Sequence, residues 1–267
     1  EDNLQLTGSF KIRGAFNKLA MMDDKRRKNG VVAASAGNHA QGLAYAAQHF
    51  GCEATIFMPE ATPLTKVSGV KSYGANVVLV GENFDEAYAT ATKSALDNDK
   101  EFIHPFADDA VIAGQGTIAL EILEKIEDIE HIIVPIGGGG LISGIAIAAK
   151  AINPNIKITG VVASGARGMK DSFEARMPID SASVKTIADG IAVRDVTPKL
   201  LDIILEYVDQ IVEVTDNETA NAILFLLEKH KLVVEGAGAV ATAAIMHKKV
   251  EIENEKVCAI VSGGNID

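Results

Sequence analysis

Four consecutive glycines between a predicted strand and a predicted helix are the residues of this sequence best suited to chemistry. Gly137, Gly138, Gly139 and Gly140 follow the apolar run HIIVPI, and a helix is expected to begin near Leu141. Such a turn lets the backbone approach an anion closely, and the free N–H groups of the first helical turn point at that anion. The pattern predicts a phosphate-binding loop. The alternative is a tight turn needed only for packing.

The glycine run does not match the common nucleotide-binding signatures. Neither register completes G-x-G-x-x-G, because Ile142 and Ser143 occupy the last positions, and G-x-x-x-x-G-K-[ST] occurs nowhere in the chain. Dinucleotide-binding and P-loop interpretations are therefore excluded.

A second group of polar residues stands in SAGNHAQG, directly after the apolar run VVAA. Ser35, Asn38 and His39 would gather at a helix N-terminus, which suits a carboxylate or a phosphate. Ordinary helix capping is the alternative. Lys11 in TGSFKIRGAF and Ser262 in VSGGNID carry no strong signal when each is taken alone.

The elements that must position these residues alternate between short apolar strands and helical patterns. The expected strands include VVAAS, ATIFMP and NVVLV in a first series, then HIIVPI, KITGVVA, DQIVEVT and VCAIVS in a second. Residues 164–207 break the rhythm and are expected to form loops and short helices. Strands joined by helical crossovers predict an α/β protein with doubly wound, mostly parallel sheets that bind ligands at the carboxyl ends of the strands.

Composition narrows the class of protein. The 267 residues carry a formal net charge of −11, and the only dense basic run is KRRK at residues 25–28, so nucleic acid is not an expected partner. Cys52 and Cys258 have no zinc-like spacing and favour a reducing, cytoplasmic setting. Glycines, Pro135 and Lys150 interrupt the most apolar window, so no membrane span is expected. The opening at Glu1 without a methionine suggests a missing N-terminal segment.

Taken together, TGSFKIRGA, SAGNHAQG, AGQGT, GGGGLISG, EGAGA and SGGN, in this order, resemble the serine/threonine dehydratase branch of the fold-type II pyridoxal-phosphate (PLP) enzymes. The resemblance covers essentially the whole chain. It implies two doubly wound domains of the tryptophan synthase β type with the cofactor in the cleft. The large domain would comprise residues 1–30 and 111–267, and residues 31–110 would form a small substrate-clamping domain. A homodimer or homotetramer is also implied.

The resemblance assigns a role to each conspicuous residue. Lys11 would form the Schiff base with pyridoxal 5′-phosphate, with Phe10 flanking the cofactor. Asn38 would bind its phenolic oxygen, and Ser262 would meet its pyridine nitrogen. The 5′-phosphate would bind at Gly137, Gly138, Gly139, Gly140 and Leu141. The substrate site would be lined by Ser35, Ala36, Gly37, Asn38 and His39.

The implied reaction is β-elimination of L-threonine, and of L-serine, to 2-oxobutanoate or pyruvate and ammonia, with the Lys11 amine as general base. A serine racemase is the nearest alternative, but Ala36 occupies the place where related racemases carry a second, proton-exchanging serine. No metal site is expected, because Ser164 replaces the metal-binding glutamate of those racemases and Lys170 lies nearby. Synthases of the same fold and a non-catalytic protein of this fold remain further alternatives.

Overall fold

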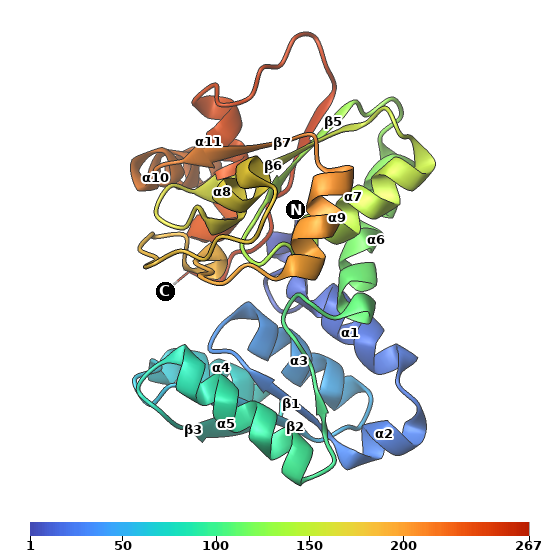
Figure 1. Cartoon of the computed structure of the whole chain (residues 1–267), viewed down its shortest axis with the longest axis vertical. Helices are drawn as coiled ribbons and strands as arrows, with labels where there is room; N and C mark the ends of the chain where they lie inside the picture. The colour runs from blue at the N-terminus through green and yellow to red at the C-terminus, as the bar shows by residue number, and fades with distance from the viewer. Residues whose placement is uncertain (267) are drawn as a thin grey trace. The chain divides into compact units, whose positions relative to one another are not determined.

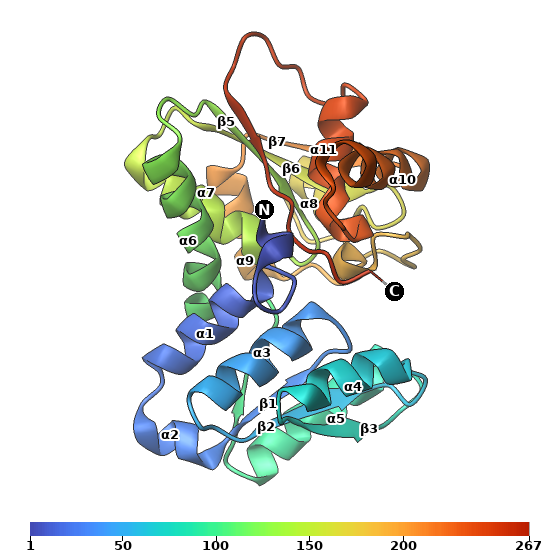
Figure 2. The same ribbon diagram turned by 180° about the vertical axis from the view of Figure 1, so that it is seen from behind.

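The chain forms two four-stranded parallel β-sheets, each covered by helices (Figures 1 and 2). The computed structural model describes residues 1–266, which divide into two compact units. Ser9–Gly114 form one unit, named here the lysine unit, and Glu1–Gly8 with the chain from Gln115 onward form the glycine-loop unit. Two parallel sheets confirm the predicted α/β class.

The sheet of the lysine unit has the strand order β3-β2-β1-β4, and every pair is parallel. The chain passes from β1 to β2 to β3 in one direction, then returns to place β4 on the other side of β1. The elements of this unit are α1 (Lys11–Met21), α2 (Asp24–Asn29), β1 (Val31–Ala34), α3 (Asn38–His49), β2 (Ala54–Met58), α4 (Leu64–Ser72), β3 (Asn76–Leu79), α5 (Phe84–Asp97) and β4 (Glu101–Phe102).

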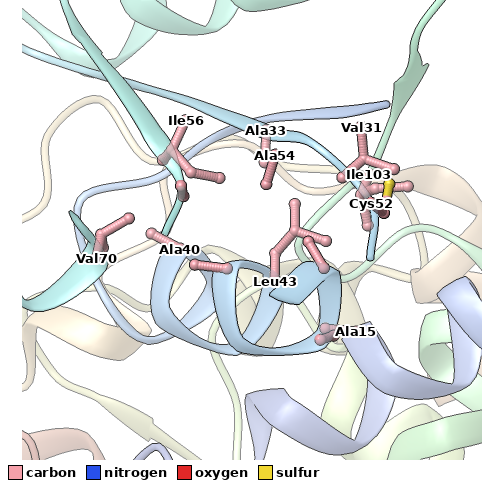
Figure 3. Close-up of a cluster of buried hydrophobic side chains, with 14 of the residues drawn as sticks. Ala15, Val31, Ala33, Ala40, Leu43, Cys52, Ala54, Ile56, Val70 and Ile103 are labelled. Atoms are coloured by element: carbon pink, nitrogen blue, oxygen red, sulfur yellow. The ribbon is translucent and has the colours of Figure 1, made fainter. Parts of the chain in front are cut away.

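Strand β1 is buried on both faces, as a central strand of a parallel sheet should be. Val31 and Ala33 belong to the apolar cluster that includes Leu43 of α3 (Figure 3). Val32 and Ala34 point the other way, into a cluster with the alanines of α5. The alternation follows from the two-residue period of a strand.

The sheet of the glycine-loop unit has the order β7-β6-β5-β8, again parallel throughout. Here too the last strand, β8, lies beside the first, β5. The elements are η1 (Asp2–Leu4), β5 (His131–Pro135), α7 (Gly140–Ile152), β6 (Lys157–Ala163), α8 (Gly168–Ala175), η2 (Asp189–Ile191), α9 (Pro198–Tyr207), β7 (Gln210–Val214), α10 (Asp216–Phe225), the π-turn η3 (Leu226–His230), α11 (Gly236–Met246) and β8 (Val257–Ala259).

Helix α6 (Asp109–Lys125) begins in the lysine unit and continues into the glycine-loop unit. The expected domains, a small one of residues 31–110 and a large one of residues 1–30 and 111–267, stay a prediction. Asp267 lies outside the described residues. Within residues 1–266, no helix combines the length and the apolar character that a membrane span requires.

Candidate active site

Lys11 is the first residue of α1, and its side chain turns toward the segment that follows β4. Its Nζ donates a hydrogen bond to the carbonyl oxygen of Pro105 at 3.0 Å and lies 5.3 Å from the centroid of the Phe10 ring. Close packing fixes the helix backbone below it. A Cβ on Gly42 of α3 would come to 3.0 Å from the backbone of Lys11 and Ile12, so any larger residue would push α1 and α3 apart by a few tenths of an ångström.

The SAGNH segment connects β1 to α3. The amide of Ser35 donates to the carbonyl of Phe57 on β2, and the amide of Gly37 donates to the Ser35 hydroxyl at 3.2 Å. No side chain caps the N-terminus of α3. The first-turn amides of a helix have no acceptor within the helix, so those of His39 and Ala40 are suited to an anionic group.

The His39 side chain is buried and electrically neutral. Its Nε2 lies 3.0 Å from the carbonyl oxygen of Ile103, and burial, followed by the positive charge of Lys11, lowers its pKa to about 3. A neutral imidazole that faces a backbone carbonyl offers no positive charge to a substrate carboxylate. If His39 belongs to the substrate site, as the sequence predicts, its backbone N–H is the group that contributes.

The segment of residues 103–108 contacts Lys11 and was not identified from the sequence. His104 accepts hydrogen bonds at Nδ1 from the amides of Phe106 and Ala107, at 3.3 and 2.9 Å. Burial and the nearby Lys11 charge lower the pKa of His104 to about 4, so it is neutral at pH 7. The signal that could have found this segment is the run HPFADD, in which a histidine and two aspartates follow a predicted helix.

These groups gather where the direction of chain winding reverses. β1 and β4 are neighbours, although the chain runs from β1 to β2 and β3 on one side of β1 before it reaches β4 on the other side. In doubly wound proteins, ligands bind beyond the carboxyl ends of the strands at such a switch point. Ser35 to His39 follow β1, and His104 with Pro105 follow β4. The lysine unit thus has its polar residues at its topological switch point.

The glycine run lies at the equivalent point of the other sheet. Gly139 caps α7 in the left-handed conformation, with φ of +95°, and the Ser143 amide makes the first bond within the helix, to the Gly139 carbonyl. The amides of Gly140 and Leu141 precede that first bond and suit an anion. A Cβ on Gly137 or Gly139 would also strike neighbouring side chains or backbone, so packing explains part of the requirement for glycine.

Ser262 follows β8, the strand beside β5, and its side chain is buried. The glycines of EGAGA allow α11 to pack closely against the residues that follow Ser262. A Cβ on Gly238 of α11 would lie 2.4 Å from the Gly263 carbonyl oxygen, and the Glu235 amide donates to that same oxygen at 3.1 Å. The start of α11 therefore packs directly against SGGN. Ser262 and the glycine run leave adjacent strands at the same edge of the sheet.

No group of three or more potential metal-binding His, Cys, Asp or Glu side chains occurs among residues 1–266. At the position discussed for racemase-like metal binding, the Ser164 amide donates to the Val214 carbonyl. Lys170 pairs with Glu174.

An α/β protein with an anion-binding glycine turn in one sheet and a lysine among neutral imidazoles in the other has the groups needed to bind a phosphorylated carbonyl cofactor. The chain belongs to the pyridoxal-phosphate dependent enzyme family, whose model matches residues 1–263. The cofactor is therefore pyridoxal 5′-phosphate.

Individual relatives agree with this assignment. The L-threonine ammonia-lyase of Thermotoga maritima is 50% identical over 274 residues, which cover 100% of this chain and 66% of the relative. The processed form of threonine deaminase isoform 2 from Solanum lycopersicum has a TM-score of 0.95 and 40% identity, covering 100% of this chain and 74% of that one. Maize serine racemase has a TM-score of 0.96 and 38% identity, covering 100% and 82%. The chain thus spans just under two thirds of the Thermotoga relative.

The residues present fit this cofactor. Its phosphate requires N–H donors, which the start of α7 supplies behind the left-handed cap at Gly139. Its carbonyl requires a primary amine, which Lys11 supplies. Ser262 brings a hydroxyl to the same sheet edge as the glycine run. Lys11 belongs to the lysine unit, whereas the glycine run and Ser262 belong to the glycine-loop unit.

Proposed function

We propose that this chain catalyses the elimination of water from L-threonine and L-serine, yielding 2-oxobutanoate or pyruvate and ammonia. Two named relatives support the proposal: an L-threonine ammonia-lyase at 50% identity and a threonine deaminase at 40% identity. The observation that carries it is the Lys11 amine, which lies between Pro105 and Phe10 at the switch point of its sheet.

Pyridoxal 5′-phosphate supplies the electron sink that makes the substrate α-proton removable. We assign the removal of that proton to the Lys11 amine. Its contact with Pro105 suits this role, because a backbone carbonyl accepts one N–H and leaves the nitrogen lone pair directed elsewhere. The amides of His39 and Ala40 would hold the substrate carboxylate. Neutral His39 and His104 add no positive charge that would compete for it.

The predicted cofactor contacts are proposed on the same basis. Lys11 would attach the cofactor, Phe10 would flank it, and Asn38 would bind its phenolic oxygen. Ser262 would face the pyridine nitrogen as a neutral hydroxyl, which does not enforce ring protonation as a carboxylate would. The phosphate contacts are Gly137, Gly138, Gly139, Gly140 and Leu141. The substrate contacts are Ser35, Ala36, Gly37, Asn38 and His39.

Racemisation is the second candidate function, because maize serine racemase has the same fold at 38% identity. A racemase needs a proton donor on the opposite face of the substrate. The methyl side chain of Ala36 carries no exchangeable proton, and it packs partly against the apolar core of the lysine unit. We therefore place racemisation below elimination. Synthase activity, or a protein of this fold without catalysis, ranks lower still, since Lys11, Asn38 and Ser262 are intact.

Product analysis by NMR tests these alternatives. The protein is incubated with PLP and with L-threonine or L-serine, and keto acid and serine chirality are followed together. We expect 2-oxobutanoate or pyruvate without D-serine. D-serine as a main product would refute the argument from Ala36. No product from either substrate would refute the dehydratase assignment.

We further propose a cytoplasmic location and a homodimer or homotetramer. Cys52 and Cys258 are both free thiols, as a reducing compartment requires. Light scattering of the holoenzyme measures the oligomeric state, and a monomeric mass at micromolar concentration would contradict the second proposal.

A further inference from the structure

Helix α1 contacts the segment of residues 103–108 through more than Lys11. Lys18 lies seven residues, or about two turns, beyond Lys11 and therefore projects from the same side of the helix. The Lys18 Nζ contacts Asp108 Oδ2 at 2.7 Å and Glu101 Oε1 at 3.0 Å. Asn17 donates to the carbonyl of Ala110 at 2.7 Å. One helix thus holds both the segment that accepts from Lys11 and the residues that follow it.

The Lys18–Asp108 pair is shielded from solvent. The two side chains are 15% and 17% exposed. Burial alone would lower the pKa of Lys18, but hydrogen bonds from Lys18 to Asp108 and Glu101 outweigh it and raise that pKa. Burial likewise opposes ionisation of Asp108, yet the hydrogen bond from Lys18 and those from the Val111 and Ala110 amides keep its pKa low. Both groups are therefore charged at neutral pH, and a shielded pair of this kind is costly to break from one side.

Asp108 is the point at which the segment becomes helix α6. Its Oδ1 accepts from the amides of Ala110 and Val111, at 2.8 and 3.1 Å, while Oδ2 faces Lys18. At the other end of the segment, Ile103 is fixed to the sheet by the hydrogen bond that its backbone N–H donates to the Val32 carbonyl. Pro105 lies between these two fixed ends. Its carbonyl is positioned by the sheet on one side and by Lys18 on the other.

We propose that Lys18 is a positioning residue for Lys11: by holding Asp108 it fixes the Pro105 carbonyl that orients the Lys11 amine. This inference rests on the proposed function of Lys11 as the base. Lys18 does not touch the reacting atoms, so its loss should leave substrate binding intact and lower the rate of proton removal. A displacement of about 1 Å in a reacting group can cost about a hundredfold in rate.

The test replaces Lys18 by methionine, which keeps the unbranched stem and removes the charge. We expect K18M to lower kcat with L-threonine about tenfold while KM changes by less than about twofold. Lys18→Arg keeps a cation that reaches both carboxylates and should restore kcat to within about threefold of wild type. Arg26→Met is the matched control, because it removes the exposed ion pair between Arg26 and Glu101 and leaves Asp108 untouched. It should behave as wild type.

A second measurement does not depend on turnover. In the protein without cofactor, hydrogen exchange of the Phe106 and Ala107 amides reports whether the segment is held, since both amides bond to His104. We expect faster exchange in K18M than in K18R or R26M at equal thermal stability. Borohydride should also trap the Lys11–cofactor adduct more slowly in K18M than in K18R or R26M.

The outcomes separate this inference from the proposed function. If wild-type protein forms keto acid and K18M matches it in kcat, exchange and trapping, the positioning role is refuted and the proposed function stands. If wild type forms no keto acid, the proposed function fails. Exchange and trapping then decide the positioning role alone: differences between K18M and R26M support it, and equality refutes it. Equal losses in K18M and K18R would also overturn it.

Discussion

The Nε2 atom of His39 lies 3.0 Å from the carbonyl oxygen of Ile103, whereas its Nδ1 atom has no partner in the described part of the chain. A carbonyl can only accept, so the imidazole must donate from Nε2 and carry no proton on Nδ1. This tautomer joins the start of α3 to the residue that follows β4. The SAGNH turn and the Lys11 partner segment are therefore held together by a neutral histidine.

The first prediction concerns pH. The pKa of His39 is about 3 in the folded state, below the value of about 6.5 for an unfolded chain, so between these values the unfolded chain binds the extra proton. The contribution of neutral His39 to stability is then fully present above about pH 6.5. It is lost as the pH falls, by about 1.4 kcal/mol per pH unit. His39→Gln keeps an N–H donor and removes the titration. Urea unfolding gives the free energy of unfolding at each pH between about 5 and 7.5. This free energy should change less with pH in the variant than in the wild type, and an equal pH dependence would contradict the assignment.

The second prediction concerns the approach of α3 to α1. Gly42→Ala would bring a Cβ to 3.0 Å from the Lys11 and Ile12 backbone, and we expect a loss of about 1–3 kcal/mol in stability. Trapping of Lys11 on the cofactor should also slow. Gly69→Ala in α4 is the matched control: nothing lies within 4 Å of its Cβ, so it should stabilise by about 0.5–1 kcal/mol. Calorimetry compares them, and equal shifts would be inconsistent with close packing at Gly42.

The third prediction separates backbone strain from anion binding at the glycine run. Gly139 and Gly74 both have positive φ, +95° and +80°, so the backbone strain of alanine at either should cost about 1–2 kcal/mol, and at Gly139 the added Cβ must also displace the end of the Ile204 side chain. Only Gly139 caps the helix proposed to hold the phosphate. Gly139→Ala should therefore also weaken PLP binding about tenfold, measured by fluorescence titration, and Gly74→Ala should not. Unchanged PLP affinity in Gly139→Ala would argue against the phosphate-binding loop.

The fourth prediction compares two fully buried serines. The Ser143 hydroxyl on α7 has no partner in the described residues, whereas that of Ser172 on α8 accepts from the Ile179 amide at 2.8 Å. Ser143→Ala removes an unpaired polar group, so it should leave the free energy of unfolding unchanged or raise it by up to about 1 kcal/mol. Ser172→Ala leaves a buried amide unpaired and should cost about 1–3 kcal/mol. A large loss in Ser143→Ala would reveal a partner for that hydroxyl.

Much of this fold follows from local sequence patterns. Runs such as VVAA and HIIVP are apolar, short and bounded by turn residues, and they form β1 and β5. Thr215 and Glu218 have the spacing of a capping box and form one at the start of α10. The Asn83 side chain likewise accepts from the Glu86 amide, but the Glu86 carboxylate accepts from the amide of Glu82. The basic run of residues 25–28 lies within the short helix α2.

What escaped prediction is non-local. Strand β4 has two residues, too few for any period to be visible, and it exists because β1 offers a free edge. The partner of Lys11 is a backbone carbonyl, so no residue type marks it. The contact between Gly238 and Gly263 joins segments that are distant in the sequence, and neither glycine predicts that contact by itself. The assigned cofactor and substrate contacts stay predictions.

The pairing of β5 with β8 has a consequence for folding order. His131 pairs with Lys157 of β6 after a short crossover, but with Val257 of β8 only once nearly the whole unit has been traversed. Closing the longer loop carries the larger entropy cost, and distant contacts form slowly. We therefore expect the glycine run to form before Ser262 reaches its place. Retention of the cofactor would then serve as a sign that the last strand has docked, and partly folded chains would be recognised by their failure to retain it.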